Sequence, residues 1–235
     1  MKQYFFIFFL SAAIISVSTS CSEVGPFIDF TPVDETLIDT TYTTDSIFTA
    51  QSKVVLLEDF TGQLCPNCPA AHDIINEIVA EHGDAVAAIA MYNYFADISE
   101  DLEFVTDQAI DLGTYLGPVI GWPTGAVDRK NFGSGILVLK DLYASHVDAQ
   151  MLVSPPCNVS ISTTYDDAIN KLNILVGVKY LSDVTTINHL SVAICENNII
   201  ALQVDATEEI PDYIHNHVLR TMLTAATGNV LSETN

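Results

Sequence analysis

One stretch of sequence decides the fold: residues 54–69, which read Val-Val-Leu-Leu-Glu-Asp-Phe-Thr-Gly-Gln-Leu-Cys-Pro-Asn-Cys-Pro. The four β-branched or aliphatic residues at its start predict a strand buried on both faces, as in a parallel or mixed sheet. The apolar residues that follow it recur at helical spacing and fall on one face: Ile74, Ile75, Ile78 and Val79. We therefore expect a helix that begins at or near the cysteine pair, and an α/β fold around it.

The Cys-x-x-Cys pair, Cys65 and Cys68, carries the chemistry of this segment. A thiolate at a helix N-terminus meets the positive end of the helix dipole, which lowers its pKa and makes it nucleophilic at neutral pH. A spacing of two residues lets the second thiol resolve a mixed disulfide and release the partner. The pair predicts thiol–disulfide exchange, with Cys65 as the exposed nucleophile and Cys68 as the more buried resolving thiol.

Other interpretations of the pair remain open. The Cys65–Cys68 bridge can be permanently oxidised and purely structural. A zinc site needs four ligands, and the other late cysteines, Cys157 and Cys195, are isolated. His72 would share a helical face with Cys68 and could ligate copper or zinc, but a partly exposed helix histidine is the simpler interpretation. We therefore predict neither a metal nor a cofactor.

Charge and composition exclude some classes of partner. The 235 residues include 8 Lys+Arg and 30 Asp+Glu, for a formal net charge of −22. This charge repels phosphate backbones, so nucleic acid is excluded as a partner, and an anionic lipid surface is an equally poor match. Hydrophobic residues make up 49% of the chain, enough for a packed core. Five cysteines are too few for a disulfide-dense small domain.

The first twenty residues have the composition of a secretory signal peptide: a short cationic start, an apolar run and then small residues. Cys21 follows directly, which resembles a bacterial lipoprotein signal, and this resemblance implies that Cys21 is lipidated and attaches the protein to a membrane. Residues 21–52 are rich in Thr, Asp and Ser and predict an extended acidic tether.

The segment around the cysteines resembles the thioredoxin superfamily. Asp59 lies six residues before Cys65, where thioredoxins carry a buried carboxylate, and this implies that Asp59 accepts the proton of Cys68. Glu58 is a neighbouring candidate, since only one of two successive strand residues can face the site.

A second thioredoxin element is matched by Gly121-Trp122-Pro123-Thr124-Gly125. The resemblance implies a cis bond before Pro123, which would face the cysteines and position a substrate backbone. Trp122 and Thr124 flank this proline and would contact the substrate.

A narrower resemblance covers nearly the whole chain. The lipoprotein-like signal, the acidic tether, both motifs above, Asp128-Arg129 and residues 215–220 resemble the outer-membrane lipoprotein family named for a twenty-eight-kilodalton outer-membrane protein. The resemblance implies a bacterial outer-membrane location and a thioredoxin-like N-domain followed by an immunoglobulin-like β C-domain.

The second half of the chain changes its hydrophobic period. A helix is expected after Ser99 and another over residues 134–150, and Pro155-Pro156 is a natural domain boundary. Beyond it, period-two alternation predicts about five strands: 157–164, 172–180, 190–196, 199–204 and 218–223. A sandwich of this type has about seven strands, so the sandwich is either truncated or a smaller domain. Cys157 and Cys195 have opposite parity relative to their apolar neighbours, which disfavours a disulfide between them.

The sequence thus predicts an α/β thioredoxin-like domain over residues 53–153 and an all-β, immunoglobulin-like sandwich over residues 154–235. The leading functional hypothesis is an exported, outer-membrane lipoprotein that exchanges disulfides with protein thiols, protein disulfides or a redox partner. The competing hypothesis is a binding or structural lipoprotein whose Cys65–Cys68 bridge is static.

Overall fold

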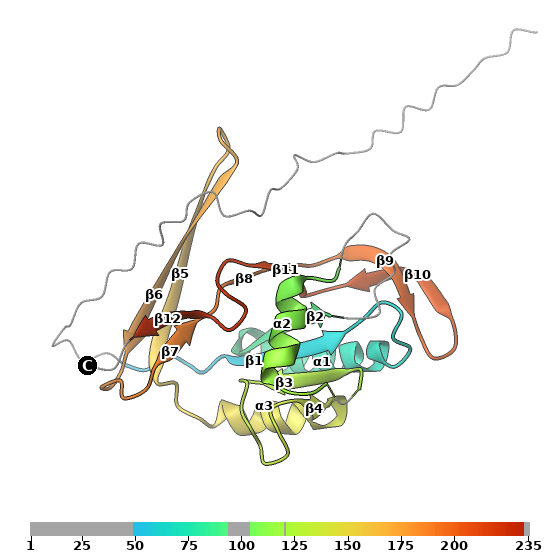
Figure 1. The fold of residues 1–235 in the computed structure, drawn as a ribbon, viewed down its shortest axis with the longest axis horizontal. Helices are drawn as coiled ribbons and strands as arrows, with labels where there is room; N and C mark the ends of the chain where they lie inside the picture. The colour runs from blue at the N-terminus through green and yellow to red at the C-terminus, as the bar shows by residue number, and fades with distance from the viewer. Residues whose placement is uncertain (1–48, 94–103, 120, 233–235) are drawn as a thin grey trace, which may run out of the picture. The chain divides into compact units, whose positions relative to one another are not determined.

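The computed structural model describes residues 49–93, 104–119 and 121–232. The predicted signal peptide, the lipidation site Cys21 and most of the predicted tether lie outside these residues. The described chain is mixed α/β. Its centre is a six-stranded mixed sheet with strand order β4-β3-β1-β2-β11-β8 (Figure 1).

The sheet combines strands from both halves of the chain: β1 (Val55–Thr61), β2 (Val86–Tyr92), β3 (Thr124–Val127), β4 (Val138–Leu139), β8 (Ala193–Glu196) and β11 (Val218–Met222). β1 pairs with β2 in parallel and with β3 antiparallel. β11 then pairs in parallel with β2 and antiparallel with β8. The strand predicted at residues 54–57 is confirmed and runs further, to Thr61.

Helices cover both faces of this sheet: α1 (Cys68–His82), α2 (Asp107–Leu116) and α3 (Tyr143–Met151). Successive side chains of β1 point to opposite faces of the sheet, where they enter two different hydrophobic cores. Leu57 packs with residues of α1 and α3, whereas Phe60 packs with residues of α2. Figure 1 shows α2 on the opposite face of the sheet from α1. This alternation decides which side chains of β1 reach the cysteines.

Two predicted helices begin later than expected. The helix predicted after Ser99 begins at Asp107, because Thr106 is extended and its hydroxyl accepts a hydrogen bond from the Ala109 amide. Ser99 itself lies outside the described residues. The helix predicted from residue 134 begins at Tyr143, because β4 and the 3-10 turn η2 (Lys140–Leu142) take up the preceding residues.

Strands dominate the chain after Pro156, as predicted, but the immunoglobulin-like sandwich is not confirmed. Among the described residues, β8 and β11 extend the central sheet, and the other strands form three two-stranded sheets. These are β5 (Cys157–Asp166) with β6 (Lys171–Tyr180), β7 (Asn188–Leu190) with β12 (Asn229–Ser232), and β9 (Ile199–Val204) with β10 (Glu209–His215). The period-two pattern identified most of these strands, but it does not specify which strand each one pairs with.

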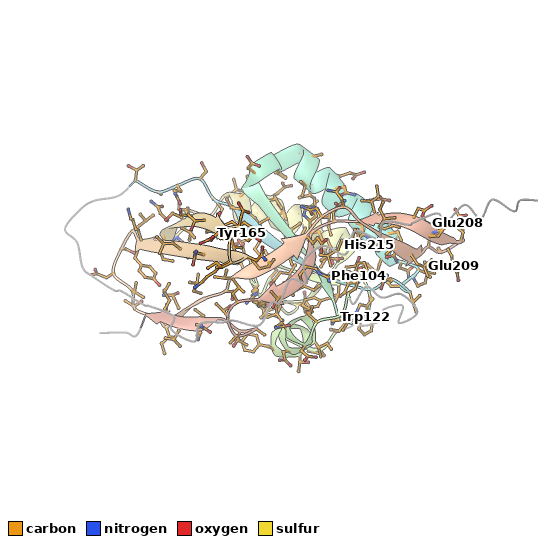
Figure 2. The ribbon with its side chains drawn as sticks, turned by 90° about the horizontal axis from the view of Figure 1, so that it is seen from above. Phe104, Trp122, Tyr165, Glu208, Glu209 and His215 are labelled. Atoms are coloured by element: carbon orange, nitrogen blue, oxygen red, sulfur yellow. A yellow bond between two sulfur atoms is a disulfide. The ribbon has the colours of Figure 1, made fainter. Side chains whose placement is uncertain are left out.

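The β5–β6 hairpin contains the clearest alternation of apolar and polar residues in the sequence. Its register pairs Val159 with Val178 and Ile161 with Val176, which gathers apolar side chains on one face. Many of these side chains are exposed, including Ile161 at 68%. Figure 2 shows Tyr165, which belongs to the same face, on this hairpin. The alternation therefore marks an amphipathic hairpin.

The predicted strand over residues 190–196 is interrupted, and its two parts join different sheets as β7 and β8. Cys157 and Cys195 are both free thiols, so the prediction that they do not form a disulfide is confirmed.

Candidate functional site

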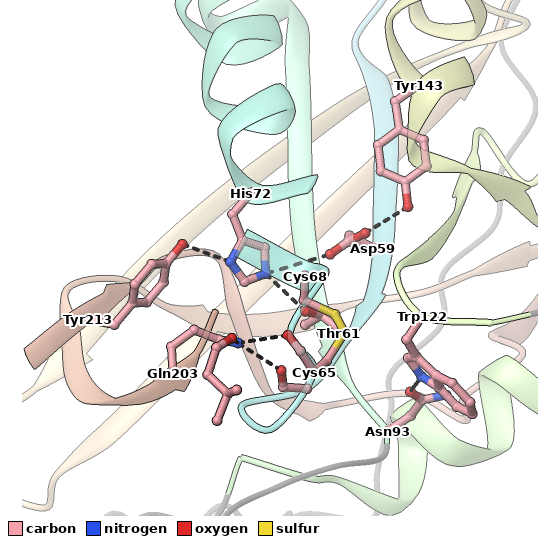
Figure 3. The surroundings of a disulfide bond; sticks show 12 residues. Asp59, Thr61, Cys65, Cys68, His72, Asn93, Trp122, Tyr143, Gln203 and Tyr213 are labelled. Atoms are coloured by element: carbon pink, nitrogen blue, oxygen red, sulfur yellow. Dashed lines mark hydrogen bonds and ion pairs between the residues drawn. A yellow bond between two sulfur atoms is a disulfide. The ribbon is translucent and has the colours of Figure 1, made fainter. Parts of the chain in front are cut away.

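Cys65 and Cys68 form a disulfide at the N-terminus of α1, with an S–S distance of 2.12 Å (Figure 3). Cys68 is the first residue of the helix, and its amide donates to the Cys65 carbonyl at 3.2 Å. Pro69 follows within the first turn, where a residue without an amide hydrogen leaves no bond unmade. The predicted strand, cysteine pair and helix are therefore confirmed.

The exposure of Cys65 differs from the prediction. Its residue is 3% exposed and Cys68 is 0% exposed, so neither cysteine presents an open surface. The reason is a long-range contact: the side-chain amide of Gln203, on β9, donates to the carbonyls of Gly62 and Cys65 at 3.2 and 3.3 Å. The β9–β10 hairpin therefore lies against the cysteine loop, a contact that local sequence patterns do not signal.

A second pair of hydrogen bonds ties the same hairpin to the loop. The Val204 amide donates to the Gln63 carbonyl at 2.7 Å, and the Gln63 side chain donates to the Leu202 carbonyl at 3.3 Å. Gln63 and Gln203 are both fully buried. The hairpin is therefore hydrogen-bonded to the loop that carries Cys65 at several points.

Asp59 is fully buried on the face of β1 that packs against α1 and α3. Its Oδ1 accepts a hydrogen bond from the Tyr143 hydroxyl at 2.7 Å. Within the described residues its Oδ2 has no hydrogen-bond partner. Burial raises the pKa of Asp59 to about 7, although the Tyr143 hydrogen bond acts in the opposite direction. Asp59 can therefore both hold and release a proton near neutral pH.

Glu58, the neighbouring candidate, points to the other face of the strand. It is fully buried and forms a two-pronged ion pair with Arg129, at 2.8 Å from Nε and 2.7 Å from Nη2. The guanidinium satisfies both carboxylate oxygens, as a buried charge requires. Asp128, the residue before Arg129, accepts a hydrogen bond from the Leu56 amide at 2.9 Å. The Asp128-Arg129 motif is thus structural.

Gly125 provides the space in which Tyr143 reaches Asp59. It lies opposite Asp59 in the β1–β3 register. A Cβ at this position would lie 2.6 Å from the Glu58 carbonyl oxygen and 2.6 Å from the Tyr143 hydroxyl. Only glycine fits without moving backbone or tyrosine.

The predicted cis bond is present between Trp122 and Pro123. Thr124 pairs with Phe60 across the sheet, so Pro123 lies one position beyond, level with the end of β1 from which the cysteine loop departs. Trp122 donates from its indole nitrogen to Asn93 Oδ1 at 2.9 Å, and Figure 3 shows this pair in the surroundings of the disulfide. The buried Thr124 hydroxyl donates to the Val138 carbonyl at 3.0 Å, so it is already bonded within the sheet.

His72 is the main residue whose role the sequence did not reveal. It lies one helical turn after Cys68, and its side chain is only 13% exposed. Its Nε2 is 2.9 Å from Thr61 Oγ1 and 3.9 Å from Asp59 Oδ2, and its Nδ1 is 2.9 Å from the Tyr213 hydroxyl (Figure 3). The spacing from Cys68 was the only sequence signal, because Tyr213 is 141 residues away.

Tyr213 belongs to a cluster of aromatic side chains that includes His215. His215 is 1% exposed, packs edge-on against Tyr213, and lies with its Nδ1 2.6 Å from the Tyr92 hydroxyl. Phe104 completes the cluster, and Figure 2 shows it beside His215. Burial lowers the pKa of His215 to about 4, so this histidine is neutral at physiological pH.

The described residues contain no cluster of three His, Cys, Asp or Glu side chains that could hold a metal. None of the helices in this part of the chain is both long enough and apolar enough to cross a bilayer.

Comparison with known proteins places the chain in a family. Residues 117–235, half of the chain, match the sequence model of the outer membrane protein Omp28. The chain belongs to the Omp28 outer membrane protein family. In this Omp28 family member the matched region runs from the cis-proline loop through β12. No curated protein matches the chain.

Two solved structures resemble this Omp28 family member. The first is HBP35 of Porphyromonas gingivalis, with a TM-score of 0.61 and 21% sequence identity over 77% of this chain and 60% of HBP35. The chain thus spans less than two thirds of HBP35, and the similarity concerns the fold. The second is a structural-genomics protein of Agrobacterium tumefaciens, with a TM-score of 0.46 and 15% identity over 74% of this chain and 73% of that protein.

Proposed function

We propose that this Omp28 family member is a thioredoxin-like thiol–disulfide exchange protein of the outer membrane. The observation that carries the proposal is the convergence of three features at one end of β1. These are the Cys65–Cys68 disulfide at a helix N-terminus, the buried Asp59, and the cis peptide bond before Pro123. A purely structural bridge does not need a buried carboxyl whose pKa is raised to about 7.

The proposed step is a reduction of the bridge by a partner thiol. A thiolate of the partner attacks the Cys65 sulfur, the Cys65–Cys68 bond breaks, and its electron pair goes to Cys68. Asp59 supplies the proton that converts the Cys68 thiolate to a thiol. A second partner thiolate then attacks the mixed disulfide at the partner's sulfur, which leaves the partner oxidised and Cys65 reduced. Pro123, with Trp122 and Thr124 beside it, is proposed to position the partner's backbone.

One observation favours the alternative, a static bridge in a structural or binding protein. Cys65 is 3% exposed, and the β9–β10 hairpin is bonded to its loop through Gln203. Exchange therefore requires the hairpin to move away from the loop. If the hairpin stays closed, the bridge is protected from thiols and only stabilises the start of α1.

The location follows from the family and from the N-terminus. The Omp28 family is a family of outer membrane proteins. We propose that residues 1–20 direct export and that a lipid on Cys21 attaches the mature protein to that membrane, with residues 21–52 as a tether.

The test is exchange with glutathione and with a dithiol, measured by alkylation of free thiols and mass spectrometry. A background with Cys21→Ser, Cys157→Ser and Cys195→Ser leaves Cys65 and Cys68 as the only cysteines of the chain, so alkylation measures the bridge alone. We expect the bridge to equilibrate with glutathione. Cys65→Ser should abolish exchange, and Cys68→Ser should trap a mixed disulfide on Cys65.

The static-bridge alternative makes the opposite prediction. The bridge would then stay oxidised in the presence of reduced glutathione under native conditions and become reducible only on unfolding. Cys68→Ser would trap no mixed disulfide. Either result would end the exchange proposal.

A further inference from the structure

A buried acid that exchanges protons with a thiol needs a route by which its own proton equilibrates with water. Asp59 is 0% exposed, so direct exchange with solvent is blocked. Its Oδ1 is occupied by the Tyr143 hydroxyl, whose phenol is buried and whose pKa burial raises well above the ordinary value. Tyr143 therefore holds the carboxyl without offering a proton exit.

The free oxygen of the carboxyl faces His72. Asp59 Oδ2 lies 3.9 Å from His72 Nε2 and is without a hydrogen-bond partner in the described chain. A gap of 3.9 Å is too long for a hydrogen bond, but a small rotation of the carboxyl or the imidazole closes it. Among the described residues that contact Asp59, His72 supplies the basic group, and it lies on the side of the unbonded oxygen.

The hydrogen-bond partners of His72 allow its imidazole ring to change tautomer. Its two ring nitrogens each lie 2.9 Å from a hydroxyl oxygen, of Thr61 at Nε2 and of Tyr213 at Nδ1. A hydroxyl can donate or accept, so both neutral tautomers of the ring are satisfied. A carboxylate or carbonyl in either place would accept only, and would hold the ring in one tautomer.

Tyr213 connects the ring to a pocket. The pocket has a volume of about 30 Å³, enough for a water molecule, and its polar lining includes His72, Tyr213, Tyr92 and Asn216. Tyr213 is partly exposed, whereas Asp59 is fully buried. The path from Asp59 across the 3.9 Å gap to His72, and through its hydrogen bond to Tyr213, therefore ends at a site that water can reach.

The electrostatic surroundings keep the ring neutral between transfers. The groups that face it are Asp59 from β1, Tyr92 from β2, and Tyr213 and His215 from β10, with Asp73 beside it on α1. Burial, and then the proximity of His215, lowers the pKa of His72 to about 4. A neutral imidazole can accept a proton at one nitrogen and release one from the other.

We propose that His72 and Tyr213 form the proton relay that connects Asp59 with solvent during disulfide exchange. The proposal rests on the function proposed above and adds residues to it. When the bridge is reduced, Asp59 gives its proton to the Cys68 thiolate and becomes a carboxylate. Tyr213 then passes a proton from water to Nδ1 of His72, and Nε2 passes one to Asp59 Oδ2. When the bridge is re-formed by an oxidised partner, the same proton leaves by the reverse path.

The experiment measures the rate at which dithiothreitol reduces the bridge of the full chain, from pH 5 to pH 9. Acid quenching and alkylation report the thiols formed, and rates are divided by the dithiothreitol thiolate concentration. The variants are His72→Gln, which keeps a polar side chain that cannot shuttle protons, and Tyr213→Phe, which removes only a hydroxyl. The control is Tyr165→Phe, which also removes one tyrosine hydroxyl, in this case the one bonded to Asn170 on the β5–β6 hairpin.

A relay controls rates and leaves the equilibrium unchanged. We expect His72→Gln and Tyr213→Phe to slow reduction at least fivefold in dilute buffer, and added imidazole buffer to restore part of the rate. The reduction potential should stay at the wild-type value, and Tyr165→Phe should match wild type in both measurements. Any other combination overturns the relay. A rate loss shared by Tyr165→Phe indicates an effect that does not depend on His72, and a shifted potential indicates a structural role. A wild-type bridge that dithiothreitol does not reduce would overturn both this relay and the exchange function.

Discussion

At the scale of single residues, burial decides what the two adjacent acids of β1 do. Glu58 and Asp59 are equally buried, yet Glu58 is paired with a guanidinium, whereas Asp59 accepts a hydrogen bond from a phenol and lies 3.9 Å from the His72 imidazole. The ion pair satisfies the charge of Glu58. Asp59 lacks such a partner, and its carboxylate form is costly to bury. The same strand therefore carries a structural acid and an acid that titrates near neutrality.

This difference predicts a pH-dependent effect of Asp59→Asn on stability. The Asp59 pKa is about 7 in the folded protein, because burial raises it from the ordinary aspartate value of 3.8, so the folded state retains a proton that the unfolded state loses. Wild-type stability should therefore fall as pH rises from about 4 to about 7, by roughly 4 kcal/mol. The asparagine does not ionise and escapes this loss.

We therefore expect Asp59→Asn to be more stable than wild type at pH 8 and nearly equal to it at pH 4. Urea unfolding at the two pH values measures the difference. The control is Asp167→Asn, since Asp167 is exposed and should give no pH-dependent difference. A destabilised Asp59→Asn protein at pH 8 would show that the folded carboxylate is well solvated.

At the scale of elements, the β9–β10 hairpin lies against the cysteine loop, and we propose that it limits access to the disulfide. The hairpin is held to the cysteine loop by hydrogen bonds from Gln203, Val204 and Gln63. Its turn is polar, and Figure 2 shows Glu208 and Glu209 there. Local opening of a hairpin requires breaking only these contacts, which costs less than global unfolding.

Removing the Gln203 contacts should expose the bridge more often. Gln203→Leu keeps the side-chain volume but loses the bonds to the Gly62 and Cys65 carbonyls, each worth about 1 kcal/mol. We expect the rate of bridge reduction by a small dithiol to rise roughly tenfold. Thr207→Ala, in the turn of the hairpin, is the control, because its hydroxyl bonds only within the turn in the described contacts. An unchanged rate in Gln203→Leu would mean that the hairpin does not limit access.

At the scale of the whole molecule, the central sheet joins residues that are far apart in the chain. β11 lies beside β2, and Val218, Leu219 and Met222 are buried in cores built on β1, β2 and α2. The described residues, 49–93, 104–119 and 121–232, accordingly fall within one compact unit. The predicted boundary near residue 153 thus passes between two parts of the chain that share a sheet.

A fragment that ends at Val153 should therefore fold poorly. Without β11 the edge of β2 is open, and the apolar residues that β11 covers become exposed. We expect residues 49–153 to unfold without a cooperative transition, as measured by circular dichroism during thermal denaturation. The control shortens the β5–β6 hairpin by replacing residues 163–174 with Asn-Gly, because those residues are largely exposed and a cooperative transition should survive. A cooperative 49–153 fragment would confirm the boundary as a domain boundary.

Periodicity and motif spacing were sufficient for the local features. The apolar run before the cysteines predicted β1, and the spacing after them predicted α1. The cis bond was implied by the resemblance of residues 121–125 to the thioredoxin superfamily. Alternation also located β5, β6, β9 and β11. Each of these features depends on residues that are close in sequence, so each can be predicted from the local sequence pattern.

The sequence by itself determined the strand–cysteine–helix unit, the pairing of Cys65 with Cys68 and the acid at position 59 as a candidate. Only the tertiary structure decided that Asp59 rather than Glu58 faces the site, that Cys65 is covered, and that His72 meets Tyr213. It also decided that the C-terminal strands extend the central sheet. The physical reason is that a hydrophobic pattern indicates which face of a helix or strand is buried. The element that packs against that face is selected by packing and hydrogen bonding between distant segments.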